Sequence, residues 1–471
     1  MLHQDIKLDQ CRRIGKYFNK EETEIRLFKT KVWMILVTFM ICNNLSVSPK
    51  GHLLFAGMDA AELLRRFGSP LYLMDEQRIR KNCQTYYNAM KAAFGEAALP
   101  LYASKAASFM EIYRIAKSEG MGIDVVSCGE IYTAKKAGFP MENAYFHSNN
   151  KTDADIAFAM ENGLGCFVAD HPEEVLAINA IAAEKGITQK ILLRLTPGID
   201  THTYEAVNTG KVDSKFGSAI ETDQAEEITK LALSCKNIRL AGFHCHVGSQ
   251  VFDSDTFLRS AEIMLKFIAD IREKYGFLAE ELDLGGGYGV RYLESDPEID
   301  IAANIHEVAA FVKEQCAALN LPLPAIRMEP GRSIVADAGI TLYTVGAVKT
   351  IPGYKNYVSV DGGMGDNPRY ALYQSTYTLC AAEKMNEPCS VVYDVVGRFC
   401  ESGDIIQPQV SLPASMKRGD ILAVLTTGAY NYSMASNYNR IPRLPIVMIK
   451  DGECRVVVRR ETLDDIVGCD L

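Results

Sequence analysis

The sequence contains no hydrophobic run long enough to span a bilayer, no cluster of basic residues and no paired-cysteine motif. Its marked apolar stretch, Val32 to Cys42, falls well short of the about 20 residues that a membrane-spanning helix needs. The formal net charge of -9 argues against nucleic acid as a partner, because phosphate contacts require grouped Lys and Arg side chains. The 13 cysteines show no regular spacing, which favours reduced thiols in a cytoplasmic protein over a disulfide framework.

Internal repeats and low-complexity tracts are also lacking, and the composition is ordinary. Apolar residues make up 48% of the chain and charged residues 23%, the usual balance of a soluble enzyme. A chain of 471 residues exceeds what one hydrophobic core commonly holds, so we expect two domains. Small molecules are the expected ligands, with neither nucleic acid nor a membrane as partner.

We interpret residues 1–43 as an extension that is either unstructured or an incorrectly assigned start, with Met34 and Met40 as alternative first residues. A cleaved or membrane-associated leader is the alternative, because Arg26, Lys29 and Lys31 precede the apolar run. The long acidic segment before the run and the proline that follows its exit are poor features for a cleaved signal peptide.

Between residues 71 and 335, short β-rich runs alternate with helical stretches such as 109–119 and 173–184. Such alternation is typical of parallel strands joined by crossover helices. In an eight-stranded (β/α) barrel the active site lies at the carboxyl ends of the strands. Here the runs end on chemically distinctive residues: Lys105, Asp124, His147, Asp170, Arg194, His244 to His246, Gly285 to Gly287 and Glu329 to Arg332. We therefore predict an α/β fold with a (β/α)8, TIM-like barrel over residues 71–335, and a functional loop at 201–217.

Beyond residue 335 the expected strands follow one another without long helices between them. They lie at 340–349, 357–361, 390–396, 420–426 and 445–459. In the last of these, Asp451-Gly452 stands between two apolar runs, which is a strong hairpin signal. We predict that residues 336–471 form an antiparallel β-barrel or sandwich domain and that residues 44–70 join it.

Three of the strand-end motifs have a functional and an ordinary interpretation. Lys105 is either a surface lysine or a Schiff-base nucleophile. Gly285 to Gly287 is either a plain turn or a loop whose bare backbone N–H groups approach a phosphate. Glu329-Pro-Gly-Arg332 is more specific, because it places a carboxylate and a bidentate anion binder within one loop.

His244 and His246 alternate along one expected strand, so both side chains are predicted to project to the same face. That spacing suits a metal in a barrel hydrolase, with His147 and His171 as the other candidate ligands. The alternative, which we favour, is that His246 stacks on a flat cofactor while the following residues, up to Ser249, offer an N–H and a hydroxyl to its phosphate.

Six motifs in this order resemble one family. The chain is similar, over about residues 50–465, to the alanine-racemase-like, pyridoxal-phosphate-dependent decarboxylases, and within them to the diaminopimelate decarboxylases. The motifs are Tyr102-Ala-Ser-Lys-Ala106, His246-Val-Gly-Ser249, Gly285-Gly-Gly287, Glu329-Pro-Gly-Arg332, Cys400-Glu-Ser-Gly-Asp404, and Gly428-Ala-Tyr430 with Ser436-Asn-Tyr-Asn439.

The resemblance implies pyridoxal 5'-phosphate as cofactor and a role for each matching residue. Lys105 would carry the cofactor covalently, and we expect desolvation at the barrel mouth to depress the pKa of its amine. Glu329 would pair with the pyridine nitrogen and His246 would stack on the ring. The remaining cofactor-binding residues would be Ser249, Gly286, Gly287, Gly331, Arg332 and Tyr430, mostly around the phosphate.

The substrate implied is meso-2,6-diaminopimelate, which the family converts to L-lysine and CO2 by decarboxylating the D-configured centre. Cations should serve the distal end of the substrate, because stabilising the carboxylate that is lost would oppose decarboxylation. The substrate-binding residues expected at that end are Arg332, Arg369, Tyr373, Glu401 and Tyr430. No metal is expected.

By the same resemblance, Cys400 protonates the carbon that loses CO2. In the family the segment carrying it reaches the neighbouring subunit's active site, which implies a head-to-tail homodimer. Lys215 and Asp404 also match the pattern, with no role beyond ordering loops. The alternatives that stay open are a decarboxylase of an ornithine- or arginine-like amino acid, a non-catalytic pyridoxal-phosphate-binding homologue, and the metal-dependent hydrolase.

Overall fold

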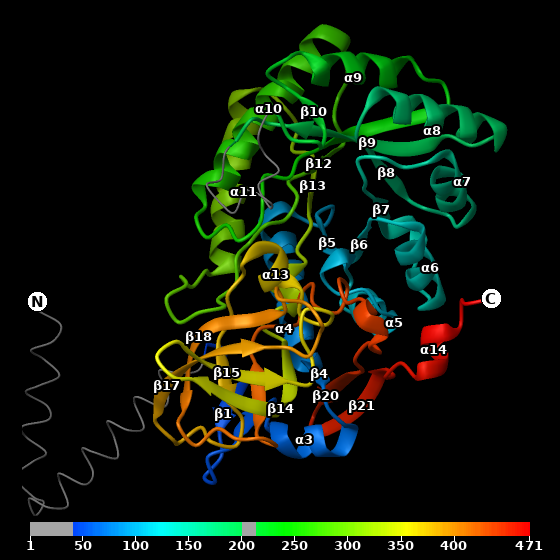
Figure 1. Cartoon of the computed structure of the whole chain (residues 1–471). Helices are drawn as coiled ribbons and strands as arrows, with labels where there is room; N and C mark the ends of the chain where they lie inside the picture. The colour runs from blue at the N-terminus through cyan, green and yellow to red at the C-terminus, as the bar shows by residue number, and fades with distance from the viewer. Residues whose placement is uncertain (1–40, 200–212) are drawn as a thin grey trace, which may run out of the picture.

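The computed structural model describes residues 41–199 and 213–471, and Figure 1 shows a barrel in one half of the molecule and a second sheet in the other. Among the described residues, eight parallel strands close into the predicted barrel, because β8 and β9 pair with each other as well as with their other neighbours. In barrel order the strands are β5 (Leu99–Ala103), β6 (Gly122–Val125), β7 (Ala144–Phe146), β8 (Cys166–Ala169), β9 (Gln189–Thr196), β11 (Ile238–His244), β12 (Glu281–Asp283) and β13 (Ala325–Met328).

Helices alternate with the barrel strands and cover their outer faces (Figure 1). Several begin at side chains that accept from the free backbone N–H groups of the first turn, among them Ser127 before α6 and Thr152 before α7. The expected helices at 109–119 and 173–184 are confirmed as α5 and α8. The helices are α4 (Glu76–Phe94), α5 (Met110–Ser118), α6 (Cys128–Lys136), α7 (Asp153–Glu161), α8 (Pro172–Glu184), α9 (Gln224–Ser234), α10 (Asp255–Tyr275), α11 (Ile301–Ala318) and α12 (Arg332–Val335).

An ionic cluster lies near the amino-terminal ends of the barrel strands. Glu281 at the start of β12 accepts from Lys190 at 2.6 Å, from Arg327 at 2.9 Å and from the Tyr145 hydroxyl at 2.8 Å. A buried carboxylate needs such partners, because its desolvation is costly. This end of the barrel is thereby filled and held together, and the opposite end is left for chemistry.

The second domain is one mixed sheet built around β14 (Gly339–Ile351). One half of β14 pairs with β4 and β19, and the other half pairs with β15. The hairpin at Asp451-Gly452 is confirmed, with β20 and β21 on its two sides. Most pairs are antiparallel as predicted, but β15 with β17 and β4 with β20 are parallel. The remaining elements are β15 (Lys355–Val360), α13 (Arg369–Tyr373), β16 (Leu379–Ala381), β17 (Cys389–Val396), β18 (Ile405–Pro413), β19 (Ile421–Val424), β20 (Ile446–Lys450), β21 (Glu453–Val458) and α14 (Leu463–Val467).

The strand β4 (Leu71–Asp75) belongs to this second sheet, where it lies between β14 and β20, although the predicted boundary at residue 71 assigned it to the barrel. All five of its residues are buried, so neither periodicity nor polarity separates it from a barrel strand. The segment before it forms a separate small sheet of β1 (Leu45–Val47), β2 (Leu53–Phe55) and β3 (Met58–Asp59), followed by α3 (Ala60–Phe67). Buried side chains of this segment, among them Leu53 and Phe55, share a core with β4 and β14.

In the described part of the chain, none of the helices has both the length and the apolar character needed to cross a membrane. The apolar run at 32–42 lies almost wholly outside the described residues, and so does most of the loop expected at 201–217.

Candidate active site

A cavity of about 830 Å³ opens where the barrel's carboxyl ends face the second domain. Most of the sequence-predicted site residues line it. Its polar lining includes Lys105, His147, Arg194, His244, His246, Ser249, Tyr292, Glu329, Arg332, Arg369, Tyr373 and Tyr430. A second cavity of about 920 Å³ lies beside the N-terminal segment, but there Arg78 is already paired with Asp337. The chemistry of the chain is therefore concentrated in the first cavity.

Lys105 lies two residues after β5, in the short turn Ser104–Ala106, and its side chain projects into the cavity with 42% of its surface exposed. Its amine is 3.3 Å from the carboxylate of Asp124, a fully buried residue near the end of the neighbouring strand β6. Burial favours a lower pKa of Lys105, but the negative charges of Asp124 and Glu329 outweigh it and raise that pKa. The expectation of a depressed lysine pKa was therefore wrong for the free protein, because it counted desolvation and not the facing carboxylates.

Tyr430 comes from the second domain and joins the turn that carries Lys105. Its backbone N–H donates to the Ala106 carbonyl at 2.6 Å, and its own backbone is left-handed, with φ of 70°. This contact fixes the segment Gly428-Ala-Tyr430 against the barrel mouth. The second domain thus contributes directly to the wall of the cavity.

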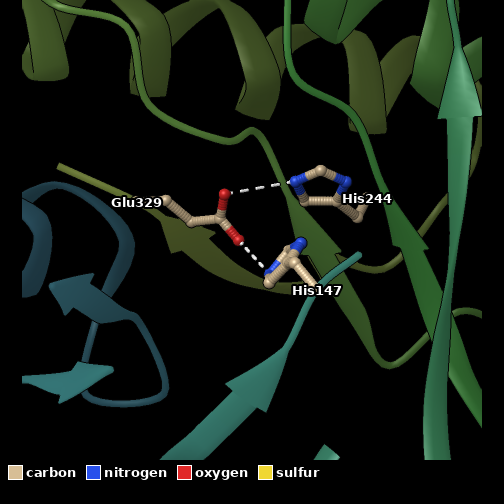
Figure 2. A group of neighbouring side chains, drawn as sticks. All are labelled: His147, His244 and Glu329. Carbon is tan, nitrogen blue, oxygen red and sulfur yellow. Dashed lines mark hydrogen bonds and ion pairs between the residues drawn. The ribbon is translucent and has the colours of Figure 1, made fainter. Parts of the chain in front are cut away.

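Glu329 follows β13 and lies between two buried histidines from other strands (Figure 2). One carboxylate oxygen is 2.7 Å from His147 Nε2 and the other is 3.3 Å from His244 Nε2. Burial alone would raise the pKa of Glu329, but the two imidazoles lower it well below its ordinary value. Glu329 is therefore a buried carboxylate that stays ionised.

A second carboxyl, Asp283 at the end of β12, lies close to Glu329 and has the opposite tendency. Burial, and then the charge of Glu329, raise the pKa of Asp283 well above its ordinary value. One of its oxygens accepts the Gly285 N–H at 2.9 Å. Two neighbouring acids whose pKa values are pushed apart share one negative charge, and here it resides on Glu329.

His246 lines the cavity two residues after β11, and its Nδ1 accepts the Gly286 N–H at 3.3 Å. Burial lowers the pKa of His246 well below its ordinary value, and the charges of Lys105 and Arg194 add to that effect. The ring is thus neutral at physiological pH, as suits a flat apolar surface.

The glycines of the Gly285 to Gly287 loop are required by close packing of strand ends. A Cβ atom at Gly286 would lie 2.1 Å from the Glu329 carbonyl oxygen, and one at Gly287 would lie 2.5 Å from the Gly248 carbonyl oxygen. Gly331 is less constrained, with its nearest neighbours at 3.0 Å. The loop therefore brings the backbones that follow β11, β12 and β13 into direct contact at the cavity floor.

Two guanidiniums at the cavity wall have hydroxyl partners and, among the described residues, no carboxylate partner. Arg332 donates to Ser249 Oγ at 3.0 and 3.2 Å and to the Tyr292 hydroxyl at 2.7 Å. Arg369 donates to the Tyr377 hydroxyl at 2.7 Å and lies over the Tyr292 ring at 5.2 Å. Buried guanidiniums that are not paired with a carboxylate form a site for an anion.

Tyr292 lies between these guanidiniums, and the sequence analysis did not single it out. Burial alone would raise its pKa, but Arg332 and Arg369 lower that pKa below its ordinary value. The signal that could have found it is its position in the segment after Gly285-Gly-Gly287, where loops of a barrel carry function.

Cys400 and Glu401 are exposed and do not line the cavity of their own chain. Asp404 fixes the turn that carries them, because its carboxylate accepts the backbone N–H groups of Phe399 at 2.7 Å and Met364 at 2.6 Å. These exposed side chains, like the exposed Leu372 and Tyr438, belong to the second domain. The loop-ordering role expected of Asp404 agrees with these contacts.

The fold separates His171 from His244, two of the candidate ligands of the metal-site hypothesis. His171 caps α8 and pairs with Glu173 at 3.1 Å, away from His244. A compact set of potential ligand atoms does exist, in His147, His244 and Glu329, which lie within 4.8 Å of one another. All three are buried and already pair among themselves, so the set has a role that needs no ion.

Comparison with protein families and curated proteins agrees with this site. Residues 76–336 match the pyridoxal-binding domain of the pyridoxal-dependent decarboxylases. The chain is 44% identical over 421 residues to the diaminopimelate decarboxylase of Bacillus subtilis, covering 89% of this chain and 95% of that protein. The Staphylococcus aureus diaminopimelate decarboxylase is 40% identical over 417 residues, covering 88% and 97%.

Solved structures give the same result. A diaminopimelate decarboxylase from M. jannaschii, determined with L-lysine, has a TM-score of 0.82 and 32% identity over 91% of this chain and 98% of that one. The Helicobacter pylori enzyme with L-lysine has a TM-score of 0.78 and 31% identity, covering 87% and 98%. From its fold, its site and these similarities, the chain belongs to the pyridoxal-dependent decarboxylase family, among the diaminopimelate decarboxylases.

Proposed function

We propose that this chain decarboxylates meso-2,6-diaminopimelate to L-lysine and CO2, with pyridoxal 5'-phosphate bound covalently to Lys105. The observation that carries the proposal is the content of one cavity: a primary amine, an ionised buried carboxylate and two guanidiniums without an acid partner in the described chain. An aldehyde cofactor needs the primary amine, and its basic ring nitrogen needs the ionised carboxylate. An anionic substrate end needs the two guanidiniums.

The residues around the cavity fit this cofactor. The Lys105 amine faces open space, and Glu329 is held ionised at the cavity floor, where it can hold a proton at the pyridine nitrogen. Bound pyridoxal phosphate supplies a sink for the electron pair left behind when CO2 departs. We assign His246 to the face of the ring, and the phosphate to Ser249, Gly286, Gly287, Gly331, Arg332 and Tyr430.

Lys105 must lose a proton before it can react with an aldehyde, and Asp124 opposes that loss in the free protein. With the cofactor bound, the buried Asp124 carboxylate would hold positive charge at the Lys105 nitrogen. The same contact therefore opposes cofactor loading in the free protein.

The distal, L-configured end of the substrate is assigned to Arg332, Arg369 and Tyr373, with Tyr430 beside them. Guanidiniums bind a carboxylate in a bidentate manner and repel a bare ammonium. An ornithine-like substrate, whose tail is a bare ammonium, would need acids in their place. A lysine/ornithine decarboxylase from Vibrio vulnificus, solved with putrescine, has a TM-score of 0.69 at 25% identity. The pair of arginines makes diaminopimelate the better choice here.

Cys400 and Glu401 are assigned to the active site of a second copy of the chain, in a head-to-tail homodimer. Their exposure and their absence from the cavity of their own subunit support this assignment. Cys400 would return a proton to the carbon that has lost CO2, and Glu401 would accept from the distal ammonium. Mixing Lys105→Ala with Cys400→Ala chains tests it: each heterodimer should hold one intact site, so an equimolar mixture with free subunit exchange should recover about a quarter of the wild-type sites. Mixtures as inactive as the separate variants would place Cys400 elsewhere.

We also propose that the enzyme acts in the cytoplasm, since the cysteines in the described part of the chain are all free. Cell fractionation followed by mass spectrometry of the native chain checks this and shows which residue of the 1–43 segment comes first. Recovery of a shortened chain outside the cytoplasm would contradict it.

The function itself is tested by reconstitution. The loaded protein should absorb at the blue edge of the visible, and borohydride should fix the cofactor on the peptide that contains Lys105. Lys105→Ala should fold, bind no cofactor covalently and release no CO2. A colourless protein that requires a metal would favour the hydrolase, and a coloured one that leaves diaminopimelate unchanged would favour a non-catalytic binding protein.

A further inference from the structure

The two histidines that contact Glu329 have no part in the mechanism described so far. Burying a carboxylate is costly unless donors or positive charges compensate it. The Glu329 side chain is only 4% exposed, and each of its oxygens faces one imidazole (Figure 2). The three side chains come from the ends of three separate strands, β7, β11 and β13, so the barrel itself sets their positions.

The state of His244 follows from its surroundings. It is fully buried, and burial, despite the opposing charge of Glu329, lowers the pKa of His244 to about 4. A neutral imidazole carries one N–H, and the contact of Nε2 with a carboxylate oxygen at 3.3 Å places that hydrogen on Nε2. His244 Nδ1, which has no hydrogen-bond partner among the described residues, is then a bare acceptor rather than a buried donor.

His147 approaches the other oxygen more closely, at 2.7 Å, and its ring meets that of His244 edge-on with centroids 4.8 Å apart. The contact with Glu329 is at an ion-pair distance without the alignment of a hydrogen bond, and in the described part of the chain His147 Nε2 has no other hydrogen-bond partner, with Asp124 Oδ1 at 3.8 Å. The two imidazoles therefore enclose one carboxylate and leave its cavity side open to a third donor.

We propose that His147 and His244 are positioning residues, which present one N–H to each oxygen of Glu329 and so keep it ionised and correctly oriented for the cofactor's pyridine nitrogen. This inference rests on the proposed function, because it assumes that the cofactor is pyridoxal phosphate. It does not depend on which amino acid is decarboxylated. It explains why a histidine stands at residue 244, two residues before the His246 assigned to the ring.

Other ionisable groups also face the Glu329 carboxylate. They limit how far its pKa can change when a histidine is removed. Lys105 and Arg194 lower the cost of its negative charge, and a protonated Asp283 does so too, because it can donate a hydrogen bond to Glu329. His147 and His244 are the groups whose ring nitrogens lie against the two Glu329 oxygens, at 2.7 and 3.3 Å. Removing either should therefore raise the pKa of Glu329 without abolishing the cavity's positive charge.

The test compares His147→Leu and His244→Leu with His147→Gln, whose side-chain amide can place an N–H near the position of Nε2. We expect each leucine variant to weaken pyridoxal phosphate binding about tenfold to a hundredfold and to lower kcat with little change in KM. The acid limb of the bound cofactor's absorbance should move to higher pH. His147→Gln should recover most of the affinity and of the pH profile.

Leucine variants with wild-type cofactor affinity and an unmoved pH profile would overturn the proposal. A glutamine variant as defective as the leucine variant, yet equally well folded, would also overturn it, because the N–H would then not be the cause.

Should a leucine variant fail to fold, a double-mutant cycle with the smaller alanine replaces it. In Glu329→Gln the charge that needs the donors is gone, so adding His147→Ala should cost far less affinity than it does in the wild type. Equal losses in both backgrounds would contradict the coupling. Cofactor affinity and spectra do not depend on the substrate, so a failure of the proposed substrate remains distinguishable from a failure of this inference.

Discussion

The amine of Lys105 lies 3.3 Å from the carboxylate of Asp124, across the neighbouring strand ends of β5 and β6. This contact raises the pKa of the lysine in the free protein against the effect of burial. Because only the neutral amine attacks an aldehyde, the contact should control how fast the apoenzyme takes up its cofactor.

Asp124→Asn should therefore shift the pH dependence of cofactor incorporation. Without the carboxylate the lysine pKa falls, so the midpoint of the incorporation rate should move down by about 1 to 3 pH units. The incorporation rate at each pH is measured by stopped-flow absorbance after apoenzyme is mixed with pyridoxal phosphate. An unchanged midpoint would mean that Asp124 does not set the protonation of Lys105.

Glu329→Ala should reduce turnover about tenfold to a few hundredfold, because a charge-assisted hydrogen bond of about 1.5 to 3 kcal/mol is lost where it is needed in the transition state. The variant should still form the covalent link at Lys105. Steady-state rates with cofactor-saturated enzyme measure the effect, and a wild-type rate would reject the role assigned to this carboxylate.

Arg369→Ala should raise KM for diaminopimelate roughly tenfold to a hundredfold, since charge-assisted hydrogen bonds to the distal carboxylate are lost. Arg369→Lys is the matched control: it keeps the charge but lacks the bidentate fork, so it should recover only part of the loss. If both variants bound substrate as the wild type does, the distal end would lie elsewhere.

Tyr292→Phe separates the hydroxyl from the ring that lies under Arg369. In the wild type the pKa of Tyr292 is lowered, so with rising pH its phenolate competes with the substrate carboxylate for both guanidiniums. KM should therefore climb at alkaline pH in the wild type. The alkaline climb should be reduced or absent in Tyr292→Phe, and identical KM profiles would show that Tyr292 stays neutral throughout.

The sequence sufficed to predict the barrel and most of the cavity lining. Parallel strands of a barrel present their carboxyl ends on one side, so the residues that close successive β-rich runs, such as Lys105 and Glu329, had to converge. The motif order then selected the cofactor.

What escaped prediction depends on contacts between distant segments. The sequence of β4 resembles that of a barrel strand, because strands buried on both faces have similar apolar sequences in either sheet. The lysine pKa had the wrong expected direction, since the distance from Lys105 to Asp124 follows from strand pairing and not from either motif. Tyr292 carries no motif of its own and gains its role only between two arginines from different domains.

The most direct test of the account is to supply meso-2,6-diaminopimelate to the cofactor-loaded enzyme and quantify both products. We predict L-lysine and CO2 in equal amounts, none from Lys105→Ala, and far slower release from L-ornithine. Absence of CO2 from diaminopimelate, or equal rates on L-ornithine, would contradict it.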